Sequence, residues 1–590
     1  MSSINPMMDS TYSKPKDSRE WLSGSDILLR ALLEEGVECV FGYPGGAVLY
    51  IYDAMHGNPD FRHMLARHEQ GAIHAADGYA RSTGRTGVVM ATSGPGAANL
   101  VTGIATAYMD SVPLVVITGN VASDLIGTDS FQEVDIVGIS QPITKHSFFV
   151  RKASDLARIV REAFYIAGTG RKGPVLIDIP KDVSAEKAVY ERPDKVYVPG
   201  YSDALEASGQ PDEERLDELI SAIQQSERPL LLAGAGVIHA EASEELRAFV
   251  DGTGIPVTTT LLGLGAIPAE HDLWLGMPGM HGTYAANQAL IHCDLLISVG
   301  ARFDDRVTMR LDGFAPKAKI AHIDIDSAEI GKLVSVAIPI KGDARQTLER
   351  LNQKLPRAVQ RKLPWIEQLQ KLKSDYRLRY KPSESELKPQ YVIEMISRTT
   401  AGEAIVTTDV GQHQMWTAQY YRFRRPRSLI TSGGLGTMGF GFPSAIGAQI
   451  GNPDRIVVSV NGDGGMQMCA QELAICAIHN IPVKIAVINN GTLGMIRQWQ
   501  ELIYEGRYSH IDLSGSPDFV KLAEAYGVKG LRASSPAEAE QVWQEALATP
   551  GPVLIDFIVS PEELVYPMVP QGQGLQDIKL GPDIGGEAHE

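Results

Sequence analysis

Short apolar segments alternate with helical patterns along most of the chain. The apolar segments are rich in valine, leucine and isoleucine and lie at 88–92, 113–119, 173–180, 229–236, 294–300, 404–411, 455–464, 483–490 and 551–559. Strands that are apolar on both faces and separated by helices are typical of parallel sheets covered by helices on both sides. The pattern therefore predicts an α/β protein with doubly wound, mainly parallel sheets.

Two stretches, 86–109 and 428–453, carry no charged residue, so a membrane-spanning alternative has to be weighed. Glycines interrupt both stretches, at Gly94 and Gly96 in the first and at Gly433 in the second. Glycines beside apolar runs are typical of a strand, a tight turn and a buried helix. We therefore expect interior segments of a globular protein and no membrane partner.

The length of 590 residues predicts three domains, because a single hydrophobic core stops growing at about 250–300 residues. Polar, Pro-containing or charge-rich stretches around 190–214 and 354–388 separate the apolar patterns. The expected parts are an N-terminal tail at 1–20, domains at 21–190, 205–350 and 385–565, and an irregular Gly- and Pro-rich tail at 566–590.

Composition narrows the class of protein and its location. Lys+Arg 54 against Asp+Glu 71 gives a net charge of −17, which disfavours nucleic acid as a partner. The four cysteines form no Cys-x-x-Cys pair and no closely spaced framework, so we expect buried thiols in a reducing compartment. Residues 1–20 contain no apolar core of a secretory signal. Together these features predict a cytoplasmic protein.

The sequence NGDGG at 461–465 follows an apolar run and precedes a helical pattern. A strand, a glycine turn and a helix start would place Asp463 at the carboxyl end of a sheet, where anionic ligands bind. Asn490 ends the next apolar run, 27 residues later (490 − 463), which is the length of one strand-helix-strand unit. Asp463 and Asn490 can therefore converge on one Mg²⁺, although capping residues in two ordinary loops would give the same letters.

GDG followed at this spacing by NN is the fingerprint of the thiamine-diphosphate enzyme family. From about 21 to 565 the chain resembles acetohydroxyacid synthase in the order of its motifs. These are FGYPGG (41–46), HEQGAIHAADGYAR (68–81), SGPGAANLVTG (93–103), GTDSFQE (127–133), GPVLIDIPKDV (173–183), GARFDDRV (300–307), GQHQMW (411–416) and TSGGLGTMGFGFP (431–443). The resemblance implies a pyrimidine-binding domain, a central FAD-binding domain and a diphosphate-binding domain, in that order.

The resemblance also assigns the coenzyme site. Mg²⁺ would be held by the side chains of Asp463 and Asn490 and the backbone carbonyl of Thr492. Met438 would wedge under thiamine diphosphate and hold its two rings in a bent conformation, whereas by itself it is an ordinary core methionine. The other expected contacts of this coenzyme are Val410, Gly411, Gln412, His413, Gly436, Gly464 and Gly465.

Glu69 matches the family's glutamate that hydrogen-bonds the aminopyrimidine ring and promotes loss of the C2 proton. Taken alone, it is also a normal acid for the start of a helix. In the family, Glu69 of one chain faces the third domain of another chain. The resemblance therefore implies a homodimer or homotetramer, and also a separate small regulatory subunit.

AGAGV at 233–237 is a weak dinucleotide signal, because the third glycine of a full fingerprint is missing. With RFDDRV at 302–307 it resembles the FAD-binding domain of acetohydroxyacid synthase. The expected FAD residues are Arg171, Gly234, Gly236, Met280, His281, Gly300, Arg302, Asp304, Arg306, Asp324 and Asp343. The implied reaction has no net redox change, so FAD would be structural.

That reaction decarboxylates pyruvate and joins the two-carbon unit to pyruvate or 2-ketobutyrate, which gives 2-acetolactate or 2-aceto-2-hydroxybutyrate. It is the first common step of valine, leucine and isoleucine biosynthesis. The resemblance assigns catalytic and channel residues to two chains: Gly46, Phe131, Gln132 and Lys181 from one, and Met495, Ile496 and Trp499 from the other. Alone, Trp499 is as easily a packing residue, and Lys181 and Arg171 are surface charges.

One position departs from the family. Its herbicide-sensitive members commonly have Gly-Gln-Val-Pro where this chain has Gly119-Asn120-Val121-Ala122. Ala122 lacks the ring that lines the channel mouth, which puts inhibitor sensitivity in doubt.

Four alternatives compete with this interpretation, and one of them, a glyoxylate carboligase, is disfavoured because that relative lacks the glutamate that this chain has at Glu69. A pyruvate oxidase would use FAD as a redox cofactor, and a catabolic acetolactate synthase would lack FAD, which RFDDRV argues against. A non-catalytic nucleotide-binding scaffold would be expected to lose Glu69, Asp463 or Asn490, and all three are present.

Overall fold

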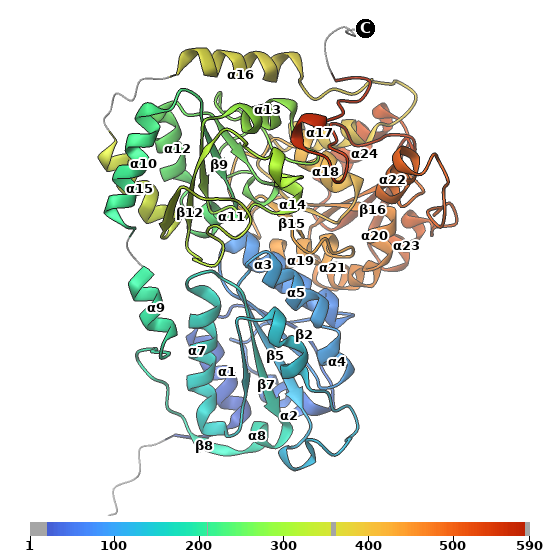
Figure 1. The fold of residues 1–590 in the computed structure, drawn as a ribbon. Coiled ribbons are helices and arrows are strands. Elements are labelled where there is room, and N and C mark those ends of the chain that lie inside the picture. The colour runs from blue at the N-terminus through green and yellow to red at the C-terminus, as the bar shows by residue number, and fades with distance from the viewer. Residues whose placement is uncertain (1–19, 209–210, 356–361, 585–590) are drawn as a thin grey trace, which may run out of the picture.

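The computed structural model describes residues 20–208, 211–355 and 362–584. Within these ranges it contains three large sheets in which every strand pairing is parallel, with helices on both faces (Figure 1). We call the parts built around them the first, middle and third units. The predicted fold class is confirmed. The predicted N-terminal tail lies outside the described residues, except for residue 20.

The first sheet has the strand order β3-β2-β4-β5-β7-β6. Its strands are β2 (Val40–Tyr43), β3 (His63–Leu65), β4 (Gly87–Ala91), β5 (Leu114–Asn120), β6 (His146–Phe149) and β7 (Pro174–Pro180). Its helices are α1 (Gly24–Glu34), α2 (Leu49–Met55), α3 (Glu69–Thr83), α4 (Pro95–Ala98), α5 (Val101–Met109), α6 (Ile136–Ser140), α7 (Leu156–Gly168) and α8 (Lys181–Ala185). Strand β4 is buried on both faces: Val88 joins the core formed with α1 and α7, and Val89 the core formed with α3 and α5.

The third sheet has the order β15-β14-β16-β17-β19-β18. Its strands are β14 (Ile405–Thr408), β15 (Leu429–Thr431), β16 (Val457–Gly462), β17 (Lys484–Asn489), β18 (Lys529–Ala533) and β19 (Val553–Ile558). Its helices are α17 (Pro389–Thr399), α18 (Gln412–Tyr420), α19 (Gly441–Gly451), α20 (Asp463–Gln467), α21 (Leu473–His479), α22 (Gly494–Ile503), α23 (Phe519–Ala525) and α24 (Pro536–Ala548). Counted in chain order, its strands are arranged as in the first sheet.

The middle sheet has the order β10-β9-β11-β12-β13. Its strands are β9 (Pro229–Ala233), β10 (Val257–Thr259), β11 (Leu295–Val299), β12 (Lys319–Asp324) and β13 (Ile338–Lys341). Its helices are α10 (Glu213–Gln225), α11 (Ala235–His239), α12 (Ser243–Thr253), α13 (Tyr284–His292), α14 (Asp305–Thr308) and α15 (Ala344–Lys354). This is a common doubly wound order, in which ligands bind where the direction of winding reverses.

The first and third units pack through α3 and α19, which lie side by side at their junction (Figure 1). Glycines allow the close approach: a Cβ at Gly78 would overlap the Ser444 carbonyl, and one at Gly447 would overlap the Ala75 carbonyl. Apolar residues of both helices share one buried core. This contact fixes the start of α3, and with it Glu69, relative to the third unit of the same chain.

The predicted linkers contain helices that the sequence pattern did not indicate. They are α9 (Tyr201–Ser208) and α16 (Leu363–Asp375), and Trp365 of α16 is buried in a core of the middle unit. A small antiparallel sheet joins β1 (Trp21–Ser23) to β8 (Lys187–Val189). In the part of the chain that the structure describes, no helix is both long and apolar enough to span a membrane.

The segment 565–584 has little regular structure, in keeping with its Gly- and Pro-rich sequence. It is nevertheless packed onto the middle unit: Val569 and Leu575 are buried there, and the Val569 N–H donates to the Met280 carbonyl (2.8 Å). No pattern in the sequence indicates where this segment docks.

Candidate active site

In the third sheet the strand order reverses between β14 and β16, so the loops that follow these strands open a crevice. Asp463 follows β16 directly, and Asn490 follows β17. Strands β16 and β17 are paired neighbours, with Gly462 opposite Ile488. The register therefore brings Asp463 and Asn490 together at one sheet edge, as their spacing predicts.

The chemistry of this pair suits a cation. Asp463 is buried, its Oδ2 has no hydrogen-bond partner, and burial raises the pKa of its carboxyl to about 7. A buried carboxylate oxygen without a partner is costly, so a cation beside Oδ2 would relieve that cost. The Asn490 amide nitrogen donates to Gln412 Oε1 (3.2 Å), and its Oδ1 accepts from the Thr492 N–H (3.1 Å).

Among the described residues, no three His, Cys, Asp or Glu side chains gather to hold a metal by themselves. Mg²⁺ does not need such a group, because it is bound by one or two protein oxygens together with phosphates and water. One carboxylate, one amide and a backbone carbonyl therefore fit Mg²⁺ with a diphosphate better than they fit a metal held by protein alone.

Glycines allow close packing around Asp463. A Cβ at Gly465 would overlap the Asp409 carboxylate, and Gly436 has a left-handed backbone (φ +73°). Asp409 accepts from the backbone N–H groups of Val410 (2.9 Å) and Gly439 (2.8 Å), which ties two loops of this edge together. His413 is buried, which lowers its pKa to about 4 and keeps the ring neutral.

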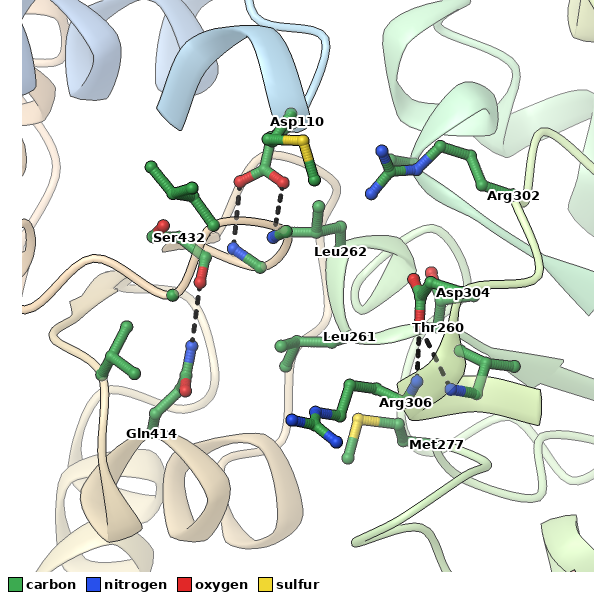
Figure 2. Close-up of a pocket in the computed structure, with 18 of the residues that line it drawn as sticks. Asp110, Thr260, Leu261, Leu262, Met277, Arg302, Asp304, Arg306, Gln414 and Ser432 are labelled. Carbon is green, nitrogen blue, oxygen red and sulfur yellow. Dashed lines mark hydrogen bonds between the residues drawn. The ribbon is translucent and has the colours of Figure 1, made fainter. Parts of the chain in front are cut away.

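The middle sheet has its own switch point, between β9 and β11. Gly236 and Gly300 meet there: a Cβ on Gly236 would lie 2.6 Å from Gly300 Cα, and Gly300 has φ +60°. Asp304 caps α14 by accepting from the N–H groups of Arg306 (3.1 Å) and Val307 (3.2 Å) (Figure 2). Arg171 donates to Asp326 (3.0 Å) and Glu329 (2.7 Å).

Both switch points open into one cavity of about 870 Å³. Figure 2 shows part of it, with Gln414 and Ser432 of the third unit facing Arg302 and Arg306 of the middle unit. The sequence-predicted residues that line it are Arg171, Gly236, Met280, His281, Gly300, Arg302, Asp304, Arg306, Asp324, Asp343, Val410, Gly411, Gln412, His413, Gly436, Met438, Asp463, Gly464, Gly465, Asn490, Thr492, Met495, Ile496 and Trp499. Gly234 does not line it, because it packs against Gly300.

The remaining predicted residues gather elsewhere, at the carboxyl edge of the first sheet. Gly46 follows β2, Glu69 follows β3, and Lys181 follows β7. Gln132 lies against Gly94, which follows β4. Glu69 begins α3 and accepts from the Asn99 side-chain amide (2.9 Å). Phe131, which precedes Gln132 in the sequence, is 86% exposed. None of these residues lines the cavity of its own chain.

Sequence reasoning missed one polar residue that lines the cavity, Asp110, and two that lie behind its lining, Asp409 and Gln498. Asp409 ends a predicted strand as Asp463 does, so its position could have been noticed. Gln498, fully buried on α22, accepts from Gln412 Nε2 (2.9 Å), and no spacing signals this contact. Asp110 lies directly after the charge-free run 86–109, and it contacts the third unit only through tertiary packing.

Family models match all three units. The thiamine pyrophosphate enzyme N-terminal binding domain matches residues 22–139, the central domain 216–351, and the C-terminal binding domain 409–557. With three doubly wound sheets and an acid-amide pair at a switch point, the fold and site define a thiamine-pyrophosphate-dependent enzyme.

Similar proteins narrow this class. The acetolactate synthase of Mycobacterium bovis is 49% identical over 95% of this chain and 92% of its own length. The acetolactate synthase large subunit of Corynebacterium glutamicum is 49% identical over 95% of this chain and 90% of its own length, and that of Lactococcus lactis 48% identical over 93% and 95%. The chain belongs to the acetolactate synthase large-subunit family, which confirms the resemblance seen in its motifs.

Proposed function

We propose that this chain is the catalytic subunit of an acetohydroxyacid synthase, which decarboxylates pyruvate and joins the two-carbon unit to pyruvate or 2-ketobutyrate. The observation that carries the proposal is the cavity that connects Asp463 and Asn490 with the nucleotide-type switch point of the middle unit. The names of the relatives support the same reaction. We place it at the first common step of branched-chain amino acid biosynthesis.

Thiamine diphosphate, when bound, supplies the electron sink that decarboxylation of a 2-keto acid requires. Asp463, Asn490 and the Thr492 carbonyl would hold Mg²⁺ and the diphosphate, and the unpartnered Asp463 Oδ2 supports this assignment. Met438 lines the cavity beside Gly436 and would support the coenzyme rings from below. The coenzyme-binding backbone at 410–413 and 464–465 is supplied by the loops that follow β14 and β16.

Glu69 would hold a proton at the aminopyrimidine ring, and it must come from a second copy of the chain. It lies on the first sheet edge, outside the cavity of its own chain. Exposed apolar side chains lie on that edge and on the third unit: Leu49, Tyr50, Leu125 and Phe131 on the first, and Leu435, Met468 and Ile496 on the second. Such surfaces mark interfaces, and they support at least a homodimer.

The middle unit would bind FAD. In the described residues Arg302 forms no ion pair or hydrogen bond with the protein, so its guanidinium is free to pair with a diphosphate. Two pyruvate anions and one proton give one 2-acetolactate anion and one CO₂, so no electrons leave the substrates. FAD would then hold the middle unit in place without changing oxidation state.

The acceptor would lie against α22. Met495, Ile496 and Trp499 line the cavity on the Asp463 side, while Gly46, Gln132 and Lys181 would approach from the second copy. We also propose a separate small regulatory subunit, because relatives are named as large subunits. A cytoplasmic location is supported by four buried cysteines without disulfides.

One experiment tests the proposed function. The purified chain is incubated with pyruvate, Mg²⁺, thiamine diphosphate and FAD, with and without oxygen, and the products are identified. Acetolactate and CO₂ in a 1:1 ratio without oxygen consumption are expected. Acetate formation that depends on oxygen would replace the proposal with a pyruvate oxidase.

A further inference from the structure

The loop 432–440 joins β15 to α19 and forms one wall of the cavity. It carries Gly436 and Met438. A buried carboxylate from the first unit holds its start: the N–H of Gly433 donates to Asp110 Oδ2 (3.0 Å), and the N–H of Gly434 donates to Asp110 Oδ1 (2.7 Å). Figure 2 shows both contacts as Asp110 reaches the loop from the end of α5.

A second contact comes from the same helix. Thr106 lies four residues before Asp110, and its hydroxyl is 2.8 Å from the hydroxyl of Thr437, with both side chains buried. Residues four apart share one helix face. Helix α5 therefore contacts the loop on both sides of Leu435 and Gly436, and the second contact is adjacent to Met438.

Asp110 is itself held firmly. Arg81 Nη2 donates to Asp110 Oδ2 (2.9 Å), Arg81 Nη1 donates to the Thr431 carbonyl (3.0 Å), and Arg81 Nε donates to Asp77 (2.5 Å). Asp110 thus accepts from three donors, which are Arg81 Nη2 and the N–H groups of Gly433 and Gly434. These donors compensate its buried charge, and such fully hydrogen-bonded networks are rigid. Through Arg81, the first unit therefore also contacts Thr431, the residue just before the loop.

At Gly434 the loop lies between the first unit and the middle unit. A Cβ at Gly434 would lie 2.8 Å from Asp110 Oδ1 and 3.3 Å from Arg302 Nη2. The backbone at Gly434 is therefore enclosed between an acid of the first unit and an arginine of the middle unit. A small displacement of Asp110 would therefore shift this wall of the cavity.

We propose that Asp110 and Thr106 are positioning residues, which fix the 432–440 loop so that Met438 supports the coenzyme. The inference rests on the proposed function, because it assumes thiamine diphosphate above Met438. Neither residue acts on the substrate. Their effect should appear in the chemical step, because a misplacement of about 1 Å far from the reacting atoms can cost about a hundredfold in rate.

The first test is Asp110→Asn, in which one of the two acceptor oxygens becomes a donor. Asp294→Asn is a matched control, because the Asp294 carboxylate likewise accepts from two successive backbone N–H groups, those of Glu227 (2.8 Å) and Arg228 (3.0 Å), away from the cavity. At saturating cofactors, we expect Asp110→Asn to lower kcat about tenfold to a hundredfold and to leave KM for pyruvate within about threefold. The control should retain the wild-type kcat.

The second test does not depend on turnover. Thr106→Val removes the contact to Thr437, and Thr253→Val is its control, since Thr253 is also a buried helical threonine that donates to the carbonyl four residues before it. With ¹³C-methyl methionine, the signal of Met438, assigned by Met438→Leu, is expected to shift in Thr106→Val and Asp110→Asn but not in either control.

The outcomes separate the two claims. An unmoved Met438 signal, or an Asp110→Asn kcat no lower than that of Asp294→Asn, overturns the inference. A wild-type chain that forms no acetolactate overturns the proposed function, while the methionine signals still test whether α5 fixes the loop.

Discussion

The first and third sheets have the same strand order, yet they present different chemistry at the same edge. In the third, the loops after β14, β16 and β17 turn into the cavity and bring Asp463 and Asn490 with them. In the first, the corresponding edge carries Glu69, Gln132 and Lys181 and faces away from that cavity. The difference supports our proposal that one chain holds two half-sites, since topology fixes where loops gather and the loop residues fix what they do.

The third-sheet half is expected to be the most sensitive to mutation. Asp463→Ala should weaken the Mg²⁺-dependent affinity for thiamine diphosphate by more than about a hundredfold. Mutation of residues that only support the ligands of a metal already lowers metal affinity by about 10- to 100-fold, and Asp463 is proposed as a direct ligand. The apoprotein should remain folded, since Oδ2 of the lost carboxylate is buried without a hydrogen-bond partner. Calorimetric titration of the coenzyme and a thermal melt measure both effects. Wild-type affinity would contradict the metal assignment.

A mutation in the first-sheet half should slow proton transfer and leave the binding of thiamine diphosphate intact. Glu69→Gln retains the size of the side chain but cannot carry its charge, so the exchange of the C2 proton of bound thiamine diphosphate should slow by about 10²- to 10⁴-fold. Quenched-flow exchange into D₂O, followed by NMR, measures this rate. An unchanged rate with intact coenzyme binding would leave Glu69 as a helix-start acid hydrogen-bonded to Asn99.

The acceptor side should show a smaller and more specific effect. The two acceptors differ by one methylene, which an apolar pocket distinguishes by about 10- to 200-fold. Trp499→Leu should leave acetolactate formation largely intact and remove most of the preference for 2-ketobutyrate. Competition between the two acceptors, with both products quantified, measures the ratio, and an unchanged ratio would make Trp499 a packing residue.

A change in the redox chemistry of the cofactor in the middle unit should leave the activity nearly unchanged. Replacing FAD with a redox-inactive analogue should keep turnover within about twofold, because the proposed reaction transfers no electrons. Loss of turnover despite binding of the analogue would mean that the flavin takes part in electron transfer.

Short patterns in the sequence predicted the features that depend on neighbouring residues, such as the strands and the loops that follow them. The apolar segments gave the strands, and the GDG-to-NN spacing brought Asp463 and Asn490 together because one strand-helix-strand unit separates them. Contacts between distant segments were not predictable in this way. The hydrogen bonds of Asp110 with Gly433 and Gly434 join residues more than 300 positions apart, and the docking of Val569 on Met280 depends on the packed surface of the middle unit.

We propose that each active site takes Glu69 from one chain and Asp463 from another. Mixing inactive Glu69→Gln and Asp463→Ala chains, after dissociation and reassociation, tests it directly. In a mixed dimer one site combines the intact Glu69 of one chain with the intact Asp463 of the other. Random pairing would then restore about a quarter of the wild-type activity. If every mixture stays inactive although mixed dimers form, both residues serve the same chain's site and the two-half-site account is wrong.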